Sequence, residues 1–249
     1  MDPHRMSELS KVVLACAVFS VGLATTARGW GQGLLSKDLA KEVMKIDAHS
    51  DPVDKLVLSP DGKRLFSGSF HSRTVTAWDS ETGTATMWLE RERLGGVWDG
   101  VMSLALSADG QQLFLANREI EVWNLQSHKE IMTLRGHEKL VSGLALAKDR
   151  KRLFSGSVDG TIKAWDLETG KEILTITARQ RPLTSIVLSA DNKRLFSGRQ
   201  RVSVWDLEAG KLAFVIDQKA GLESLASSDD GKRIFCGTSP GTIMVWTIE

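Results

Sequence analysis

The sequence of 249 residues predicts an all-β protein, and three repeated features lead to that prediction. A short apolar run ends in a tryptophan five times, at gaps of 45, 42, 40 and 41 residues. A hairpin-type turn precedes each run, and after four of the runs a polar turn leads into another apolar strand. Each full repeat is therefore a unit of four short strands. The five tryptophans are Trp78, Trp123, Trp165, Trp205 and Trp246.

The strand that carries the tryptophan has nearly the same sequence in every repeat. An aspartate follows the tryptophan in three repeats, as Asp79, Asp166 and Asp206. A period of about 40–45 residues with a Trp-Asp signature is typical of a β-propeller, in which each repeat forms one blade. The five runs are VTAWD (75–79), IEVWN (120–124), IKAWD (162–166), VSVWD (202–206) and IMVWT (243–247).

A turn sequence lies upstream of each tryptophan and separates the first two strands of the repeat. An aspartate opens it, and glycine or asparagine often comes next, because these residues tolerate the backbone of a tight hairpin. Apolar residues flank the turn on both sides, which predicts two paired strands. The five segments are DGKRLF (61–66), DGQQLF (109–114), DRKRLF (149–154), DNKRLF (191–196) and DGKRIF (230–235).

The fourth strand follows the tryptophan in repeats one to four, at residues 84–89, 129–134, 171–176 and 211–216. The fifth repeat has no such strand, but KEVMKI (41–46) closely matches KEIMTL (129–134). We therefore expect residues 41–46 to complete the last blade and to close a ring of five blades. An open ring that pairs with another chain and a fragment of a longer array are the alternatives.

Together these repeats resemble the WD40 repeat family, over about residues 41–249. The resemblance implies a propeller that acts as a platform for other proteins. In that family a buried hydrogen-bond chain often links four residues of a blade, and repeat three matches it with His137, Ser155, Asp159 and Trp165. A catalytic triad is the alternative, but a nucleophilic serine needs exposure and an oxyanion hole, whereas this serine lies in mid-strand beneath a tryptophan. We expect a structural role.

The first 40 residues differ from the repeats. Residues 12–27 (VVLACAVFSVGLATTA) carry no charge, follow basic residues and end in small ones, which is typical of a secretory signal peptide. We expect a signal peptide at 1–27, a linker at 28–40 and the propeller at 41–249. The protein would then be exported to a periplasm or the extracellular space. Anchoring in a membrane by this segment is the alternative.

Composition and motifs favour a protein without catalytic activity. Net charge is +1, which gives no electrostatic basis for binding nucleic acid or a membrane surface. The five histidines are scattered and no glycine-rich phosphate loop is present, so we expect no metal and no cofactor. We expect neither enzymatic activity nor any membrane association beyond the leader.

A partner would bind one rim of the ring, over the central channel, as the resemblance implies. The expected rim is rich in arginine and edged by aromatic residues, which are enriched at binding hot spots. We expect a monomer that recognises a protein partner, with an acidic peptide or a glycan as the chemistry that such a patch suits. The alternative function is a glycan- or small-molecule-binding propeller, possibly a hydrolase, that uses the channel. The candidate residues are Arg179, Arg181, Arg199, Arg201, Trp98, Phe70 and His71.

Overall fold

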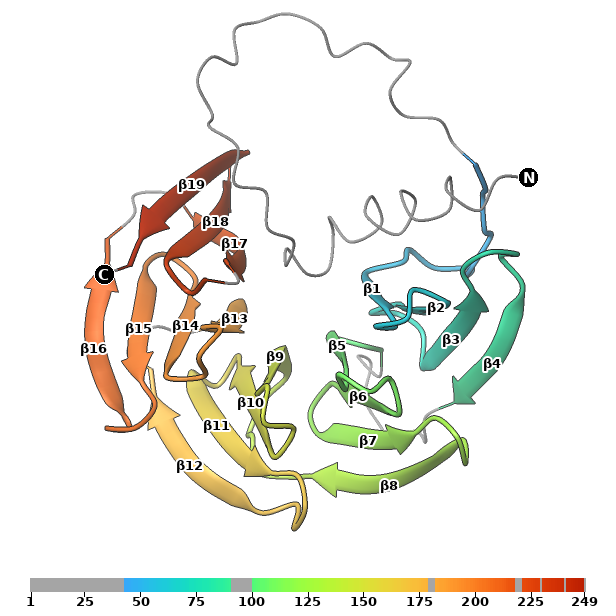
Figure 1. Ribbon diagram of the computed structural model, residues 1–249, viewed down its shortest axis with the longest axis horizontal. Helices are drawn as coiled ribbons and strands as arrows, with labels where there is room; N and C mark the ends of the chain where they lie inside the picture. The colour runs from blue at the N-terminus through green and yellow to red at the C-terminus, as the bar shows by residue number, and fades with distance from the viewer. Residues whose placement is uncertain are drawn as a thin grey trace, which may run out of the picture.

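The computed structural model describes residues 43–90, 100–178, 182–217, 221–228, 230–239 and 241–248. These residues form nineteen strands in five antiparallel sheets. The five sheets follow one another around an arc (Figure 1). The all-β architecture predicted from the repeats is therefore confirmed. No helix within the described ranges is long and apolar enough to cross a membrane.

Each sheet is one blade, and its strands pair in chain order. Blade one contains β1 (Lys55–Leu58), β2 (Arg64–Gly68), β3 (Thr74–Asp79) and β4 (Ala85–Glu90). Blade two contains β5 (Ser103–Leu106), β6 (Gln112–Ala116), β7 (Ile120–Asn124) and β8 (Lys129–Leu134). Blade three contains β9 (Val141–Leu146), β10 (Arg152–Ser157), β11 (Thr161–Asp166) and β12 (Glu172–Thr177). Blade four contains β13 (Ser185–Leu188), β14 (Arg194–Gly198), β15 (Val202–Asp206) and β16 (Lys211–Ile216), and blade five β17 (Gly221–Ser227), β18 (Arg233–Ser239) and β19 (Thr242–Thr247).

The turn between the first two strands of each blade has the backbone that its sequence predicts. Its second residue has a positive φ in all five blades, and this left-handed conformation is easy for glycine and tolerable for asparagine. Blade three places an arginine there, at a φ of 60°, which is unusual for a long side chain. The five residues are Gly62, Gly110, Arg150, Asn192 and Gly231.

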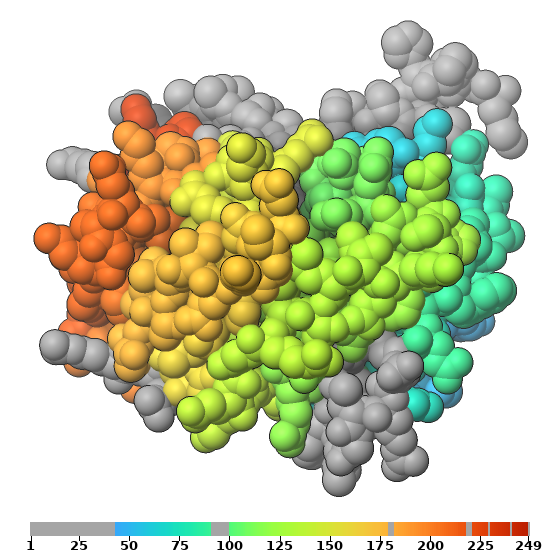
Figure 2. Space-filling model, turned by 90° about the horizontal axis from the view of Figure 1, so that it is seen from below, coloured from blue at the N-terminus to red at the C-terminus, as the bar shows by residue number. Residues whose placement is uncertain are grey.

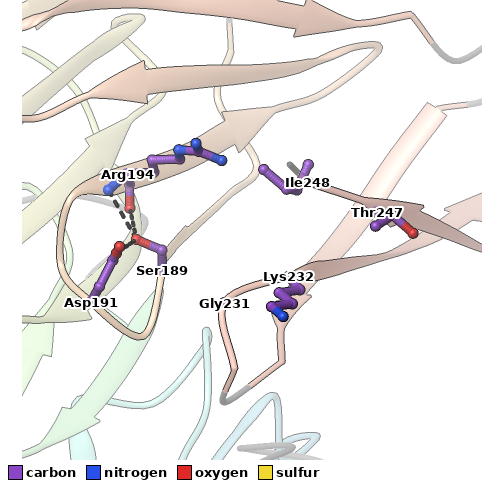
Figure 3. A pocket seen from close by; sticks show the side chains of 7 residues that line it. All are labelled: Ser189, Asp191, Arg194, Gly231, Lys232, Thr247 and Ile248. Atoms are coloured by element: carbon purple, nitrogen blue, oxygen red, sulfur yellow. Dashed lines mark hydrogen bonds between the residues drawn. The ribbon is translucent and has the colours of Figure 1, made fainter.

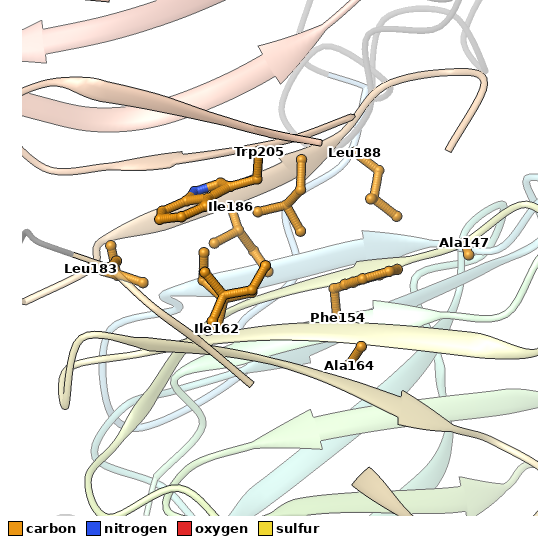
Figure 4. Packing of buried hydrophobic residues seen from close by; sticks show 11 residues of the cluster. Ala147, Phe154, Ile162, Ala164, Leu183, Ile186, Leu188 and Trp205 are labelled. Atoms are coloured by element: carbon orange, nitrogen blue, oxygen red, sulfur yellow. The ribbon is translucent and has the colours of Figure 1, made fainter. Parts of the chain in front are cut away.

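Apolar cores lie between consecutive blades. The innermost strands β1, β5, β9, β13 and β17 contact one another in that order. Between blades three and four, Phe154 and Ile162 face Ile186 and Trp205, and all four side chains are buried (Figure 4). Seen from outside the arc, blades two, three and four lie side by side (Figure 2). The propeller is thus held together by packing of sheet against sheet.

Blade five differs from the prediction, because the described residues give it three strands. Residues 43–46, expected to be its fourth strand, have no strand structure. Met44 and Ile46 lie instead against Gly83, in the turn between β3 and β4 of blade one. Blades one and five stand at the two ends of the arc (Figure 1). The predicted closure by residues 41–46 is therefore not observed, and Lys41 and Glu42 lie outside the described residues.

Candidate interaction surface

The four residues singled out in blade three meet in one buried hydrogen-bond chain. The indole N–H of Trp165 donates to Ser155 Oγ at 2.8 Å, and Ser155 Oγ lies 2.7 Å from His137 Nε2. His137 Nδ1 lies 3.2 Å from Asp159 Oδ2. With a proton on Nδ1, the neutral histidine accepts from the serine and donates to the carboxylate, so each polar atom has a partner.

Burial and hydrogen bonding move the pKa values of this network in a consistent direction. Burial lowers the pKa of His137 below 6.5, although the carboxylate of Asp159 opposes that shift. Burial alone would raise the pKa of Asp159, but hydrogen bonds from the side chain and backbone of Thr161 and from the backbone N–H of Glu138 outweigh it and lower the pKa to about 2. At neutral pH the pair is therefore a neutral imidazole beside a carboxylate.

This geometry makes Ser155 a poor nucleophile. The side chain is fully buried in β10, and its oxygen already contacts an indole and an imidazole. A substrate carbonyl has no access to such a hydroxyl. What the arrangement can do is hold three segments of blade three together, namely the link before β9, strand β10 and strand β11.

Shorter versions of this hydrogen-bond chain occur in blades one and four. In blade one His49 Nε2 lies 2.8 Å from Ser67 Oγ, which accepts from Trp78 at 2.8 Å. In blade four Trp205 donates to Ser197 at 2.8 Å. These contacts agree with the sequence, which keeps the serine in both blades.

Blades two and five lack the serine, and the hydrogen bonding of the indole N–H differs between them. In blade two the carboxylate of Glu121 accepts from Trp123 Nε1 at 3.1 Å. In blade five Cys236 occupies the serine position, and Trp246 Nε1 is buried without a hydrogen-bond partner among the described residues. Burial raises the pKa of the Cys236 thiol to about 11, so the group stays protonated. Blade five therefore contains a buried donor, the indole N–H of Trp246, that has no acceptor among the described residues.

Reasoning from the sequence missed a partly buried ion pair next to the network of blade three. Lys163 Nζ donates to Glu172 Oε2 at 2.7 Å and to Thr175 Oγ1 at 2.8 Å. The signal was a lysine in an otherwise apolar tryptophan strand, but its partner depends on the register between β11 and β12, in which Lys163 faces Thr175. It also missed Glu121, a carboxylate in the equivalent position of β7.

The candidate rim consists of the turns between the second and third strands and the links between blades, because a meander of four strands brings these connections to one end of each sheet. Phe70 and His71 follow β2, and their rings contact edge to face at 5.3 Å between centroids. Arg199 and Arg201 follow β14 and are exposed. Trp98, Arg179 and Arg181 lie outside the described residues.

Charge on this rim is only partly compensated. Arg201 pairs with Asp217 at 3.2 Å, and Arg135 pairs with Glu119 at 2.9 Å. Three exposed cations, Arg118, Lys139 and Arg199, make no ion pair in the part of the chain that the structure describes. The exposed carboxylate of Glu138 adjoins Lys139 in the chain, so the excess positive charge comes mainly from the two arginines.

The opposite rim carries a pocket of about 430 Å³ between blades four and five. Its basic residues are Arg194 and Lys232, and Asp191 supplies a carboxylate (Figure 3). The hydroxyl of Ser189 is already used within its own turn, where it bonds Asp191 and the backbone of Arg194. No group of His, Cys, Asp and Glu side chains among the described residues could hold a metal ion.

The fold and the tryptophan networks define the class, a propeller assembled from sheet repeats. The model of the family described as "WD domain, G-beta repeat" matches residues 40–79, 128–166 and 210–247. The chain therefore carries WD40 repeats at these three positions, as the resemblance in its sequence implied.

Relatives and a solved structure agree with this class. U3 small nucleolar RNA-interacting protein 2 of Mus musculus is 31% identical over 133 residues, which are 47% of this chain and 28% of the relative. Autophagy-related protein 16 of Arabidopsis thaliana is 29% identical over 208 residues, 82% of this chain and 32% of the relative. A solved structure titled "Structure of U3-55K" has a TM-score of 0.71 at 23% identity, over 80% of this chain and 62% of that one. The chain spans less than a third of the length of these two curated relatives.

Proposed function

We propose that this chain is a non-catalytic interaction module that binds an acidic segment of a partner protein on its arginine-bearing rim. The observation that carries the proposal is the exposed pair Arg118 and Arg199, which have no ion pair among the described residues. Arginine suits this task because its planar guanidinium binds carboxylates through two parallel hydrogen bonds.

The chemistry available elsewhere supports binding over catalysis. The Ser-His-Asp set of blade three is buried and saturated with contacts inside the blade. Phe70 and His71 add an aromatic edge to the same rim. A rim of this kind offers charge for steering and aromatic surface for contact.

The test is affinity capture from native extract with the tagged full chain, compared with an Arg199→Glu/Arg201→Glu variant. We expect the wild type to enrich a protein with an acidic segment and the variant to lose it, because the substitutions reverse the charge of the β14–β15 turn. Lys193→Glu/Lys232→Glu on the opposite rim is the matched control and should keep the partner. Loss in both variants would indicate a general charge effect and contradict the rim assignment.

The same experiment separates protein from nucleic acid as the recognised partner. Two relatives are U3 small nucleolar RNA-interacting proteins, from Mus musculus and Homo sapiens, and exposed arginines also bind phosphates. We expect enrichment to survive ribonuclease treatment of the extract. Enrichment that disappears with the RNA would replace the acidic protein by an RNA-containing particle.

We further propose, on the sequence of residues 1–27 alone, that the module acts outside the cytoplasm. An uncharged run after basic residues is the support for that location. Expression of the full chain with a reporter at its C-terminus, followed by fractionation of the host, tests it. We expect export of a shortened chain, and a full-length chain in the cytoplasm would contradict the proposal.

A further inference from the structure

The outer edge of blade five is uncovered in the described molecule. Strand β19 pairs with β18 on one side and with no strand of the described residues on the other. Its side chains Ile243 and Val245 are 73% and 53% exposed. An unpaired apolar edge of this kind is a template for another strand.

Equivalent positions in the other blades show what normally covers these two side chains. The residue three before the tryptophan is Val75, Ile120, Ile162 or Val202, and each is at most 1% exposed. The covering groups are the fourth strand of the blade and the blade that follows. In blade two, for example, Ile120 pairs with Leu134 and Val122 pairs with Met132.

Residues 43–46 have the sequence of a fourth strand but belong to no sheet in the structure. The fourth strands of the complete blades carry an apolar pair two residues apart: Met87 and Leu89, Met132 and Leu134, Leu174 and Ile176, and Phe214 and Ile216. Met44 and Ile46 repeat this pair. In the register of the other blades, Met44 would face Val245 and Ile46 would face Ile243. Val43 is 68% and Met44 is 37% exposed in their present positions, so both side chains have surface left to bury against a sheet.

The connection that follows this segment has the length of a link between blades. Eight residues, 47–54, separate Ile46 from β1, and eight, 177–184, separate Ile176 from β13. If residues 43–46 pair with β19 of another copy, the link to blade one of their own chain is therefore as long as the link between blades three and four. Met44 and Ile46 of that strand would then lie beside Val245 and Ile243.

We propose that residues 43–46 of one copy of this chain pair with β19 of a second copy, so that two copies exchange strands. Pairing within one chain would have to bring blade one against blade five and so repack the four buried cores between blades. Exchange between copies leaves those cores unchanged, and tightly packed interiors resist deformation. When each copy gives its segment 43–46 and receives that of the other, both edges are filled and the assembly ends at two copies.

Site-directed cross-linking tests which chain supplies the strand. One full-length chain carries Met44→Cys and a differently tagged one carries Val245→Cys. Both carry Cys16→Ser, so that the buried Cys236 is the one native cysteine left. We expect a short bis-maleimide to link the mixed chains into a covalent heterodimer. Ile173→Cys, on the exposed side of β12, replaces Val245→Cys in the control mixture and should give no product.

A single chain with both Met44→Cys and Val245→Cys tests the alternative, in which the segment pairs with β19 of its own chain. Exchange predicts covalent dimers from this chain as well. A bridge confined to one chain would show closure within the molecule and overturn the proposal. Absence of any bridge in the mixture would overturn it too, because the edge and the segment would then not meet.

Light scattering on the uncrosslinked full chain provides an independent measurement. We expect a mass twice that of one chain. Met44→Asp should reduce it to the mass of one chain, because it places a charge in the apolar contact between Met44 and Val245. Val43→Asp is the matched control, since the equivalent Ile131 of β8 is 49% exposed, and it should leave the dimer intact. A monomeric wild type, or equal dimer content in all three chains, would contradict the exchange.

Discussion

Among single residues, Ser155 shows how one hydroxyl joins several strands. It contacts an indole and an imidazole at once, and the imidazole continues to a carboxylate. The sequence made this network predictable, because repeat three has all four residues at the positions that the WD40 resemblance implies. The acceptor that Glu121 provides in blade two was not predictable, because a side chain on the tryptophan strand itself took over a role that the second strand has elsewhere.

Cys236 offers a test of what the serine contributes. We expect Cys236→Ser to be more stable than Cys236→Ala by about 1 kcal/mol, because the new hydroxyl can accept from the orphaned indole of Trp246. Urea unfolding of the two variants measures the difference. Ser197→Cys in blade four is the reverse control and should be destabilising by a similar amount. Equal stability of the serine and alanine variants would mean that the indole finds another acceptor.

His137 predicts a dependence of stability on pH. Its folded pKa lies below the unfolded value of 6.5, so its neutral form stabilises the fold fully above pH 6.5 and this contribution falls as the pH drops through that value. The stabilisation that comes from the Asp159 carboxylate is lost at lower pH, between 3.8 and about 2. We expect the melting temperature to fall between pH 7 and pH 5, and His137→Gln to reduce that slope. An unchanged slope would contradict the assignment.

At the level of elements, local sequence patterns predicted nearly all of the strands that the structure contains. The Asp-Gly and Asp-Asn turns have the left-handed residue that they require, and the tryptophan strands lie beside them in the expected order. Within the described ranges, the one predicted strand that differs is that at 41–46, of which residues 43–46 are seen and form no strand. Its pattern identifies the kind of strand it can be, but the partner of a strand depends on how distant parts of the chain meet, which no local pattern contains. The Lys163–Glu172 pair was missed for the same reason.

The aspartate after the tryptophan has a separate role in the turn to the fourth strand. Asp166 Oδ1 accepts from the backbone N–H groups of Glu168 at 3.0 Å and Thr169 at 2.7 Å. Asn124 makes the equivalent two bonds in blade two. We therefore expect Asp166→Asn to keep the melting temperature and Asp166→Ala to lower it. If both variants melt alike, the side-chain acceptor is dispensable.

At the level of the whole molecule, the arc has a well-covered middle and a poorly covered end. Blade three lies between two apolar cores, whereas β19 has an uncovered face and an unpaired edge. Arrays of repeats unfold most easily at their ends, because each repeat is stabilised by its neighbours.

Hydrogen exchange measures this gradient. In the Met44→Asp chain, where a second copy should not cover the edge, we expect amides of β19 to exchange at least about tenfold faster than those of β11, since outward amides of an edge strand lack partners. Mass spectrometry of peptides from 242–248 and 161–166 gives the comparison. Equal protection in the two peptides would mean that the end of the arc is covered by other parts of the chain.

The even placement of the tryptophans also provides optical probes. The chain contains no tyrosine, so its intrinsic fluorescence comes from tryptophan alone. Each blade places one signature indole in different surroundings, from the buried, hydrogen-bonded Trp165 to the unbonded Trp246. Replacing signature tryptophans by phenylalanine one at a time would therefore assign the emission to individual blades. Unfolding of the arc could then be followed blade by blade without any added dye.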